Sequence, residues 1–279
     1  MGEAFDAMAF RWINRSLRDA QELQASGDTL SEFSMGRLET IKLGYSLDDE
    51  RWVYLSNILG FLRLNTLKTF EADGLWLRHD IDRTVSFFVP NILIKNCPCL
   101  DHTSTALKVF RDVESLDITI VLGLSFPVSW LISEISHLRS SLRELTVRGR
   151  EDNTLLQPSD DTPSLCDFEV LERLDIMSSH LSEFKEPNVT PAAQANIVSW
   201  DAAMPSSLKT LIIRSCVQST VREAGNFVRL KEARQSKLES LHLEFVHGCL
   251  SEAVQKDVVT LSEQCSNAGV MLTVDWDGR

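Results

Sequence analysis

The chain has 279 residues, of which 43% are hydrophobic and 24% charged, so it can bury a sizeable core and does not resemble a disordered protein. Its formal net charge of -12 lacks the basic footprint of a nucleic-acid binder, so we expect neither DNA nor RNA as a partner. Residues 1–11 contain Glu3 and Asp6 and no long apolar run, which predicts no secretory signal and no membrane span. Six thinly spread cysteines are typical of reduced thiols, so we expect a cytoplasmic or nuclear protein.

An amphipathic helix is predicted at the start of the chain. Phe5, Met8 and Trp12 recur at helical spacing, which places their side chains on one face. We expect residues 1–35 to form a helical cap, because a repeat array needs a cover at its open end. Residues 36–279 are then predicted to form one continuous array.

An apolar ladder of the form Leu-x-x-Leu-x-Leu runs through this array. The five clearest copies begin at residues 113, 142, 171, 208 and 238, so the successive steps are 29, 29, 37 and 30 residues. Weaker copies begin at Leu38, Leu67 and Val89, and Leu272 and Val274 match the end of one more. A fixed period in this range predicts a solenoid in which each copy adds one short strand to a parallel sheet, about nine strands in all.

Helical periodicity recurs between several of these strands. The first predicted helix begins near Asp48 or Asp49, and the second follows Pro127. The apolar positions of the four predicted helices are, in chain order, Trp52, Leu55, Ile58, Leu59 and Leu62; Trp130, Leu131, Ile135 and Leu138; Val221, Ala224, Phe227, Val228 and Leu230; and Ala253, Val254, Val258 and Leu261. Strands that alternate with helices predict an α/β fold.

Two stretches interrupt the rhythm. Residues 149–163 are rich in Asp, Ser, Thr and Pro, which predicts a loop rather than a helix. Residues 178–205 fill the longest step between two copies; they are predicted to begin as a loop and to contain a helix over about 191–200.

Two copies extend the ladder to Leu-x-x-Leu-x-Leu-x-x-Cys, ending at Cys97 and Cys216. With a period near 29, the pattern over roughly residues 35–276 resembles leucine-rich repeat proteins, in the degenerate form found in the C-terminal parts of fungal F-box/leucine-rich-repeat-like proteins. The resemblance implies a leucine-rich-repeat-like solenoid: a curved horseshoe with a parallel sheet on the concave face and helices and loops on the convex face. In that family the repeats recognise proteins, and an N-terminal F-box docks to a ubiquitin-ligase adaptor. Residues 1–38 carry no Leu-Pro start and no F-box pattern, so adaptor docking does not follow.

Motifs for catalysis or cofactor binding are missing or incomplete. Neither Gly-rich nucleotide-binding pattern occurs, and Gly123-Leu-Ser125-Phe-Pro127 lacks the closing glycine of a nucleophile elbow. Cys97, Cys99 and His102 offer three zinc ligands where a structural site needs four. We therefore expect no cofactor, no metal and no catalytic residues, and we predict that the protein is not an enzyme.

The strand alternation assigns a set of charged side chains to the face opposite the core. The candidate partner-binding residues on this face are Asp117, Glu144, Arg148, Arg173, Asp175, Arg214, His242 and Glu244. Arginine is favoured at interfaces because its planar head bonds carboxylates and stacks on aromatic rings. The alternative is a solvated ladder of cross-strand ion pairs, each of little energetic value.

The leading hypothesis is a protein-protein interaction module that binds a protein or peptide on the concave face. The resemblance implies one form of it, the substrate-recognition part of a ubiquitin-ligase-like receptor. Two alternatives stay open: a hydrolase-like enzyme built on a loop insert such as residues 149–163, and a structural remnant with no dedicated partner.

Overall fold

The computed structural model describes residues 38–44, 52–73, 76–78, 85–96, 106–120, 128–149, 164–181, 203–231, 236–246 and 251–276. The chain divides into two compact units, Met1–Val113 and Glu114–Arg279, which we call the first unit and the second unit. Three sequence-based predictions lie outside the described residues: the helical cap over 1–35, the helix over 191–200, and the loop over 149–163 except for its first residue, Gly149, which ends a strand.

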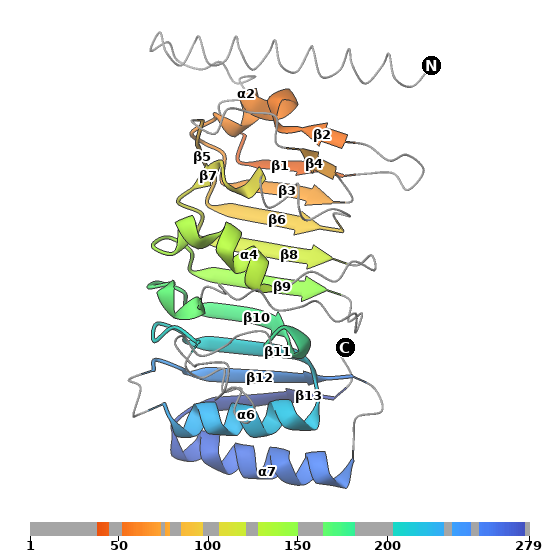
Figure 1. Ribbon diagram of the computed structural model, residues 1–279, viewed down its shortest axis with the longest axis vertical. Helices are drawn as coiled ribbons and strands as arrows, with labels where there is room; N and C mark the ends of the chain where they lie inside the picture. The colour runs from red at the N-terminus through yellow and green to blue at the C-terminus, as the bar shows by residue number, and fades with distance from the viewer. Residues whose placement is uncertain are drawn as a thin grey trace, which may run out of the picture. The chain divides into compact units, whose positions relative to one another are not determined.

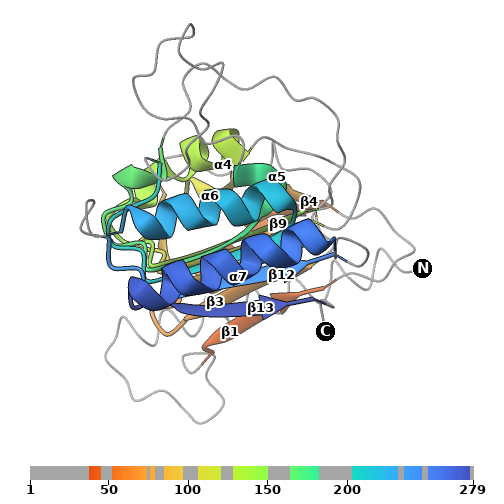
Figure 2. The ribbon, with the colours of Figure 1, turned by 90° about the horizontal axis from the view of Figure 1, so that it is seen from below.

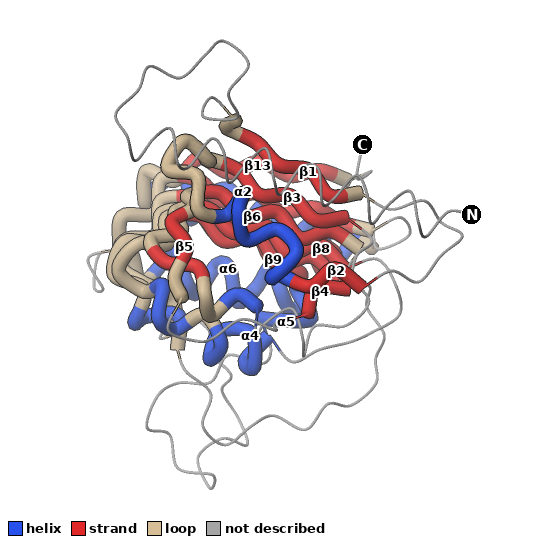
Figure 3. Tube along the Cα trace, turned by 90° about the horizontal axis from the view of Figure 1, so that it is seen from above, coloured by secondary structure: helices blue, strands red, loops and turns tan. Residues whose placement is uncertain are grey.

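The first unit contains three paired parallel strands, β1 (Thr40–Leu43), β3 (Thr69–Asp73) and β6 (Asn91–Lys95), which are neighbouring red strands in Figure 3. The register aligns Ile41 with Phe70 and Phe70 with Ile92, so the apolar residues of the ladder stack in rows. All three side chains are buried. One buried apolar row therefore runs across the three neighbouring strands, as the ladder predicts.

Smaller elements surround these strands. Two short pairs, β2 (Trp52–Tyr54) with β4 (Trp76–Arg78) and β5 (Phe87–Phe88) with β7 (Phe110–Arg111), are parallel as well. A 3₁₀ turn η2 (Leu55–Ile58) leads into the single-turn helix α2 (Leu59–Leu62). The ring of Phe110 lies 5.9 Å from that of Phe70 and 6.1 Å from that of Phe87, so aromatic packing joins β7 to β3 and β5.

The second unit contains six parallel strands that pair in the order of the chain, side by side in Figure 1. They are β8 (Ser115–Ile120), β9 (Glu144–Gly149), β10 (Arg173–Met177), β11 (Thr210–Cys216), β12 (Ser240–Phe245) and β13 (Met271–Asp275). The inward rows include Leu145, Leu174 and Leu211, of which at most 1% of the surface is exposed. In β8 to β12 both ladder positions are buried in the same core.

Helices cover one face of this sheet, as Figure 2 shows for α4 (Val128–Glu134), α5 (Ser178–Leu181), α6 (Gln218–Arg229) and α7 (Glu252–Asn267). Two 3₁₀ turns, η3 (Ser136–Leu138) and η4 (Leu165–Asp167), lie on the connections before β9 and β10. The Ser251 hydroxyl caps α7 by accepting a hydrogen bond from the Val254 amide at 3.2 Å. The opposite face of the sheet is thereby left to the polar side chains.

A polar contact and a close approach join α6 to α7. The Asp257 carboxylate accepts hydrogen bonds from Gln218 Nε2 and Arg222 Nε, each at 2.9 Å. At Gly225 the helices come so close that an added Cβ atom would lie 2.5 Å from the Gln264 amide oxygen. The last two helices therefore pack as a pair on the sheet.

The strand predictions are confirmed at all nine ladder copies, including the weak ones that form β6 and β13. The predicted helices at Pro127, Val221 and Ala253 are also found, as α4, α6 and α7. The predicted helix from Asp48 is wrong at its start, because Trp52–Tyr54 pairs with β4 as a strand and the helical turns begin only at Leu55. The loop predicted from Ser178 is wrong at its start too, since Ser178–Leu181 forms α5.

Candidate functional site

Two rows of outward side chains cross the strands of the second unit on the face without helices. The register places the members of the first row opposite one another, and these are Asp117, Thr146, Asp175, Ile212, His242 and Thr273. The second row lies two residues further along and includes Thr119, Arg148, Met177, Arg214, Glu244 and Asp275. The rows hold six of the eight candidate residues. The other two, Glu144 and Arg173, lie two residues before the first row, at the start of their strands.

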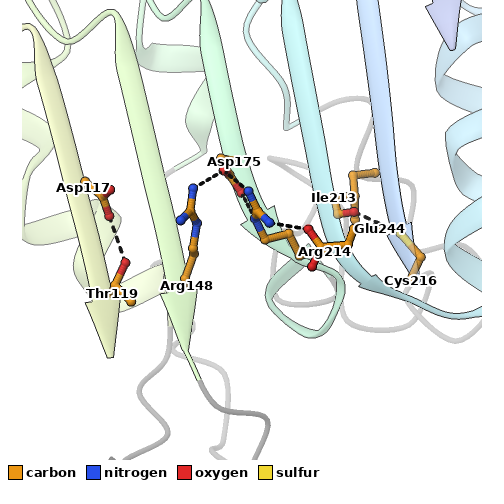
Figure 4. A network of polar contacts seen from close by, with 8 residues as sticks. All are labelled: Asp117, Thr119, Arg148, Asp175, Ile213, Arg214, Cys216 and Glu244. Carbon is orange, nitrogen blue, oxygen red and sulfur yellow. Dashed lines mark hydrogen bonds and ion pairs between the residues drawn. The ribbon is translucent and has the colours of Figure 1, made fainter. Parts of the chain in front are cut away.

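Four of the candidate residues meet in one polar network on β9 to β12 (Figure 4). Arg214 donates from Nε and Nη2 to the two carboxylate oxygens of Asp175, at 2.7 and 2.9 Å. Arg148 donates from Nη2 to Oδ2 of the same carboxylate at 2.6 Å. On its other side, Arg214 donates from Nη1 to Glu244. Asp175 therefore lies between two arginines that reach it from the strands on either side.

Burial and charge act in opposite directions on Asp175. Only 1% of its side chain is exposed, and desolvation, the largest single influence, raises its pKa. The hydrogen bonds from Arg214 and Arg148 and their positive charges act against desolvation, and together they hold the pKa below its ordinary value. The same contact raises the pKa of Arg214. Both groups thus stay ionised at neutral pH, and the network is a set of true ion pairs.

The arginines and Glu244 are the accessible part of this network. The side chains of Arg148, Arg214 and Glu244 are 37%, 26% and 25% exposed. Arg148 binds Asp175 through one terminal nitrogen, and its buried Nε has no hydrogen-bond partner. Because Asp175 is itself covered, its role is to hold the two guanidinium groups in place, while Arg148 and Glu244 present charge at the surface.

A bulge follows Arg214 at the end of β11. The register between β11 and β12 shifts between Ile213 and Cys216, and Ser215 adopts a left-handed φ of 53°. Two hydrogen bonds hold the bulge: the Ser178 hydroxyl donates to the Ser215 carbonyl at 2.6 Å, and the Cys216 thiol donates to the Ile213 carbonyl at 3.2 Å. The ladder cysteine thus bonds the backbone where the strand ends.

The remaining candidates do not join the network. Glu144 and Arg173 are Cα partners on adjacent strands and are both exposed, yet the described structure contains no ion pair of Arg173. Glu144 accepts a long hydrogen bond of 3.5 Å from Ser115, and Asp117 accepts one of 3.0 Å from Thr119. His242 is half-buried, and its Nε2 atom has no hydrogen-bond partner.

Some features of this face could not be predicted from the sequence. Ile212 lies in an outward row but is only 6% exposed, and Asp175 is fully covered. Alternation gives the face of a side chain, whereas its exposure depends on the long side chains of neighbouring strands. The bulge at Ser215 has only a weak signal in the sequence: the small residue before Cys216 fits a turn off the sheet.

The described residues contain no other arrangement with evident chemistry. Within these ranges, no group of three or more His, Cys, Asp and Glu side chains could hold a metal ion. Burial raises the pKa of the Cys216 thiol to about 12, so this cysteine is protonated and inert at neutral pH. The zinc motif considered above, Cys97 to His102, lies outside the described residues.

Comparison of the chain with protein-family models, curated proteins and solved structures found no match. Among the described residues, none of the helices has the length and apolar character needed to cross a membrane.

Proposed function

We propose that this chain is a protein-recognition module, a leucine-rich-repeat-like solenoid whose outward strand rows bind a protein or peptide partner. One observation carries the proposal: the face of β8 to β12 opposite the helices holds a cluster of fixed, partly exposed charges in register, with Arg148, Asp175 and Arg214 at its centre. Strands that follow the chain order and alternate with helices support the solenoid.

Fixed charges suit recognition because a partner does not have to order them on binding. An arginine immobilised at an interface loses about 0.5–1.5 kcal/mol of side-chain freedom. Arg214 already makes two hydrogen bonds to Asp175 and one to Glu244, and Arg148 is held by the same carboxylate. Much of that ordering cost has therefore been met in the folded protein before a partner arrives.

The partner is expected to carry both acidic and basic groups. Arg173 is exposed and makes no ion pair with the described residues, so it is free to meet a carboxylate. Asp117 and Glu144, on the two strands before it, are open to a basic side chain. The outward face thus presents separate sites for charges of both signs within three adjacent strands, which favours an extended polypeptide over a small ligand.

Affinity capture with matched charge reversals tests this proposal. The test variant is Arg173→Glu, which lies outside the Asp175 network and should fold normally. The control is Arg229→Glu, which makes the same charge change on an exposed position of α6, on the helical face. Captured proteins would be quantified by mass spectrometry from cell extract, after circular dichroism has shown that both variants melt like the parent protein.

We expect at least one partner that the parent protein and Arg229→Glu retain and Arg173→Glu loses. Such a partner should then bind the purified protein with an affinity that falls at least fivefold in Arg173→Glu, the loss of one interfacial charge contact. Equal recoveries with both variants would refute recognition through the part of the outward face around Arg173. A ubiquitin-ligase adaptor among the specific partners would extend the proposal to substrate recognition for a ligase.

A further inference from the structure

Arg214 crosses a small square of outward residues on β10 and β11. Asp175 and Ile212 are Cα partners, and two residues further along Met177 and Arg214 are Cα partners as well. Because Arg214 bonds Asp175, its side chain spans the diagonal of this square, between the positions of Ile212 and Met177. All other members of the two outward rows are polar or charged. The two apolar members therefore lie on either side of this one arginine.

The edges of the Arg214 guanidinium group are occupied. Of its five N–H bonds, one from each nitrogen atom is donated: Nε and Nη2 donate to Asp175, and Nη1 donates to Glu244. The two acceptors lie on β10 and β12, the strands on either side, so the hydrogen bonds run sideways across the sheet (Figure 4). The short side chain of Asp175 keeps the bonded guanidinium group close to the sheet. Because 26% of the Arg214 side chain is exposed, the part of this group open to a ligand is chiefly its flat outer face.

The charges around Arg214 favour a neutral ligand at this flat face. Two carboxylates, Asp175 and Glu244, already bond the guanidinium group, and a third carboxylate would be repelled by both. A cation would instead lie beside Arg214 itself and beside Arg148, which bonds the same Asp175. A neutral aromatic ring meets neither repulsion. It stacks on the face of a guanidinium group, which leaves the hydrogen bonds in the plane intact.

Met177 gives a second reason to expect an aromatic ring. Its side chain is only half-buried, whereas Ile212 on the other side of Arg214 is covered. Met177 is therefore the apolar side chain that a ligand on this face can reach. A thioether sulfur contacts aromatic rings favourably, and the unbranched side chain adapts to their shape. A ring that stacks on Arg214 can thus also contact Met177.

We propose that the flat face of Arg214, together with Met177, binds an aromatic side chain of the partner polypeptide. This inference rests on the proposed function and deepens it, since it adds an aromatic group to the acidic group that Arg173 binds on the adjacent strand. The ring stacks on the guanidinium plane and contacts the thioether of Met177. Asp175 and Glu244 do not touch the ring; they are positioning residues that hold the guanidinium group flat against the sheet.

The probe is N-acetyl-phenylalaninamide, a neutral capped amino acid that is titrated into the full chain. Its comparator is N-acetyl-cyclohexylalaninamide, in which a saturated ring of similar size replaces the aromatic ring. NMR of the Arg214 Nε–H group, assigned by its absence in Arg214→Lys, reports stacking, because protons above the face of an aromatic ring are shielded. We expect the aromatic probe to shift this resonance upfield in a saturable way. The saturated probe should bind about threefold more weakly or worse, the factor that a cation–π contact at a partly exposed site supplies.

Two lysine substitutions then separate the flat face of the arginine from its charge. Arg214→Lys keeps a cation beside Asp175 but has no guanidinium plane, so it should weaken the aromatic probe about threefold or more, as followed by NMR of the Met177 methyl group. Arg222→Lys makes the same change in the ion pair with Asp257 on α6 and should leave the affinity unchanged. If Arg214→Lys does not fold, the comparison of the two probes on the parent protein decides the question alone.

Three outcomes would overturn the proposal: equal affinities for the two rings, no saturable shift at Arg214, or equal affinities of the two lysine variants for the aromatic probe. The capture experiment with Arg173→Glu is independent of these measurements. A captured partner combined with a negative probe experiment refutes the aromatic contact alone. A positive probe experiment without a captured partner refutes the proposed function alone.

Discussion

Replacing Asp175 by asparagine tests whether the network is a buried ion-pair cluster. The change keeps the size of the side chain but removes the charge that two arginines share, and it points an amide donor at guanidinium donors. Breaking a fully buried ion pair costs about 3–5 kcal/mol. Because 37% of Arg148 and 26% of Arg214 remain exposed, water screens part of the loss, and we expect Asp175→Asn to lower the free energy of unfolding by about 2–3 kcal/mol.

The assay is thermal unfolding of the full chain at neutral and at acid pH. The expected loss corresponds to a melting temperature lowered by roughly 5–10 °C at neutral pH. The pKa of Asp175 is lowered in the folded protein from an ordinary value of 3.8, so its carboxylate adds stability that is fully present above that pH. That stability disappears as the pH falls through the lower folded pKa, and the parent protein and the variant should then converge.

Glu172→Gln is the matched control. Glu172 lies near Lys209 and Arg143, at 3.1 and 3.5 Å, and its pKa is lowered chiefly by the hydrogen bond from Lys209. Its ion pairs are exposed to solvent, so we expect no measurable change in the melting temperature. If Asp175→Asn is no more destabilising than this control, or if its effect is the same at every pH, the cluster does not act as a buried ion-pair network.

Three further predictions concern the core and the helices. At pH 8, iodoacetamide should label the exposed Cys166 in the folded protein but leave Cys216 unmodified until denaturant is added, since the pKa of Cys216 is raised to about 12. Peptide mapping by mass spectrometry distinguishes the two cysteines, and labelling of Cys216 before denaturant is added would contradict its burial. Leu211→Ala should lower the free energy of unfolding by about 2–5 kcal/mol in denaturant titrations, because this side chain has no exposed surface. Gly225→Ala should change stability by less than about 1 kcal/mol, since the end of the flexible Gln264 side chain can move aside and alanine favours the helix; a larger loss would mean that Gln264 is fixed.

The strands could be predicted because their buried residues recur in a simple pattern along the sequence. Residues two apart on a strand face the same side, so each buried pair, such as Leu145 and Val147, leaves an apolar mark at a regular distance from the next. Even the weak copy at Ile92 and Ile94 is a strand with both side chains buried. The prediction depends on the repeat, because the pattern of a single short strand would be ambiguous.

The errors fall in elements that span only about one period. β5 and β7 have two residues each, and α5 has four, so neither alternation nor helical spacing can develop within them. At Trp52 the apolar spacing also fits a helix, but pairing with Trp76–Arg78 decides for a strand. Tertiary contacts of this kind are invisible in a local pattern.

The candidate site was predictable in membership but not in organisation. Alternation placed Arg148, Asp175, Arg214 and Glu244 on one face, and the structure joins these four. Alternation did not distinguish the covered Asp175 from the exposed Arg173, because exposure depends on where the long side chains of flanking strands lie. The bulge at Ser215, directly after Arg214, also has no periodic signature.

An outward carboxylate between two cations occurs in both units, and the difference between them locates the candidate site. In the first unit Glu71 binds Lys42 at 2.8 Å and Lys95 at 2.9 Å, and hydrogen bonds from these lysines lower its pKa. Each lysine contacts one oxygen of Glu71, and Lys42 remains 70% exposed. Arg214 has a planar fork that bonds both oxygens of Asp175 and still reaches Glu244, so its cluster extends across several strands. The arginine cluster builds a fixed surface across four strands, and for that reason we propose recognition on the second unit.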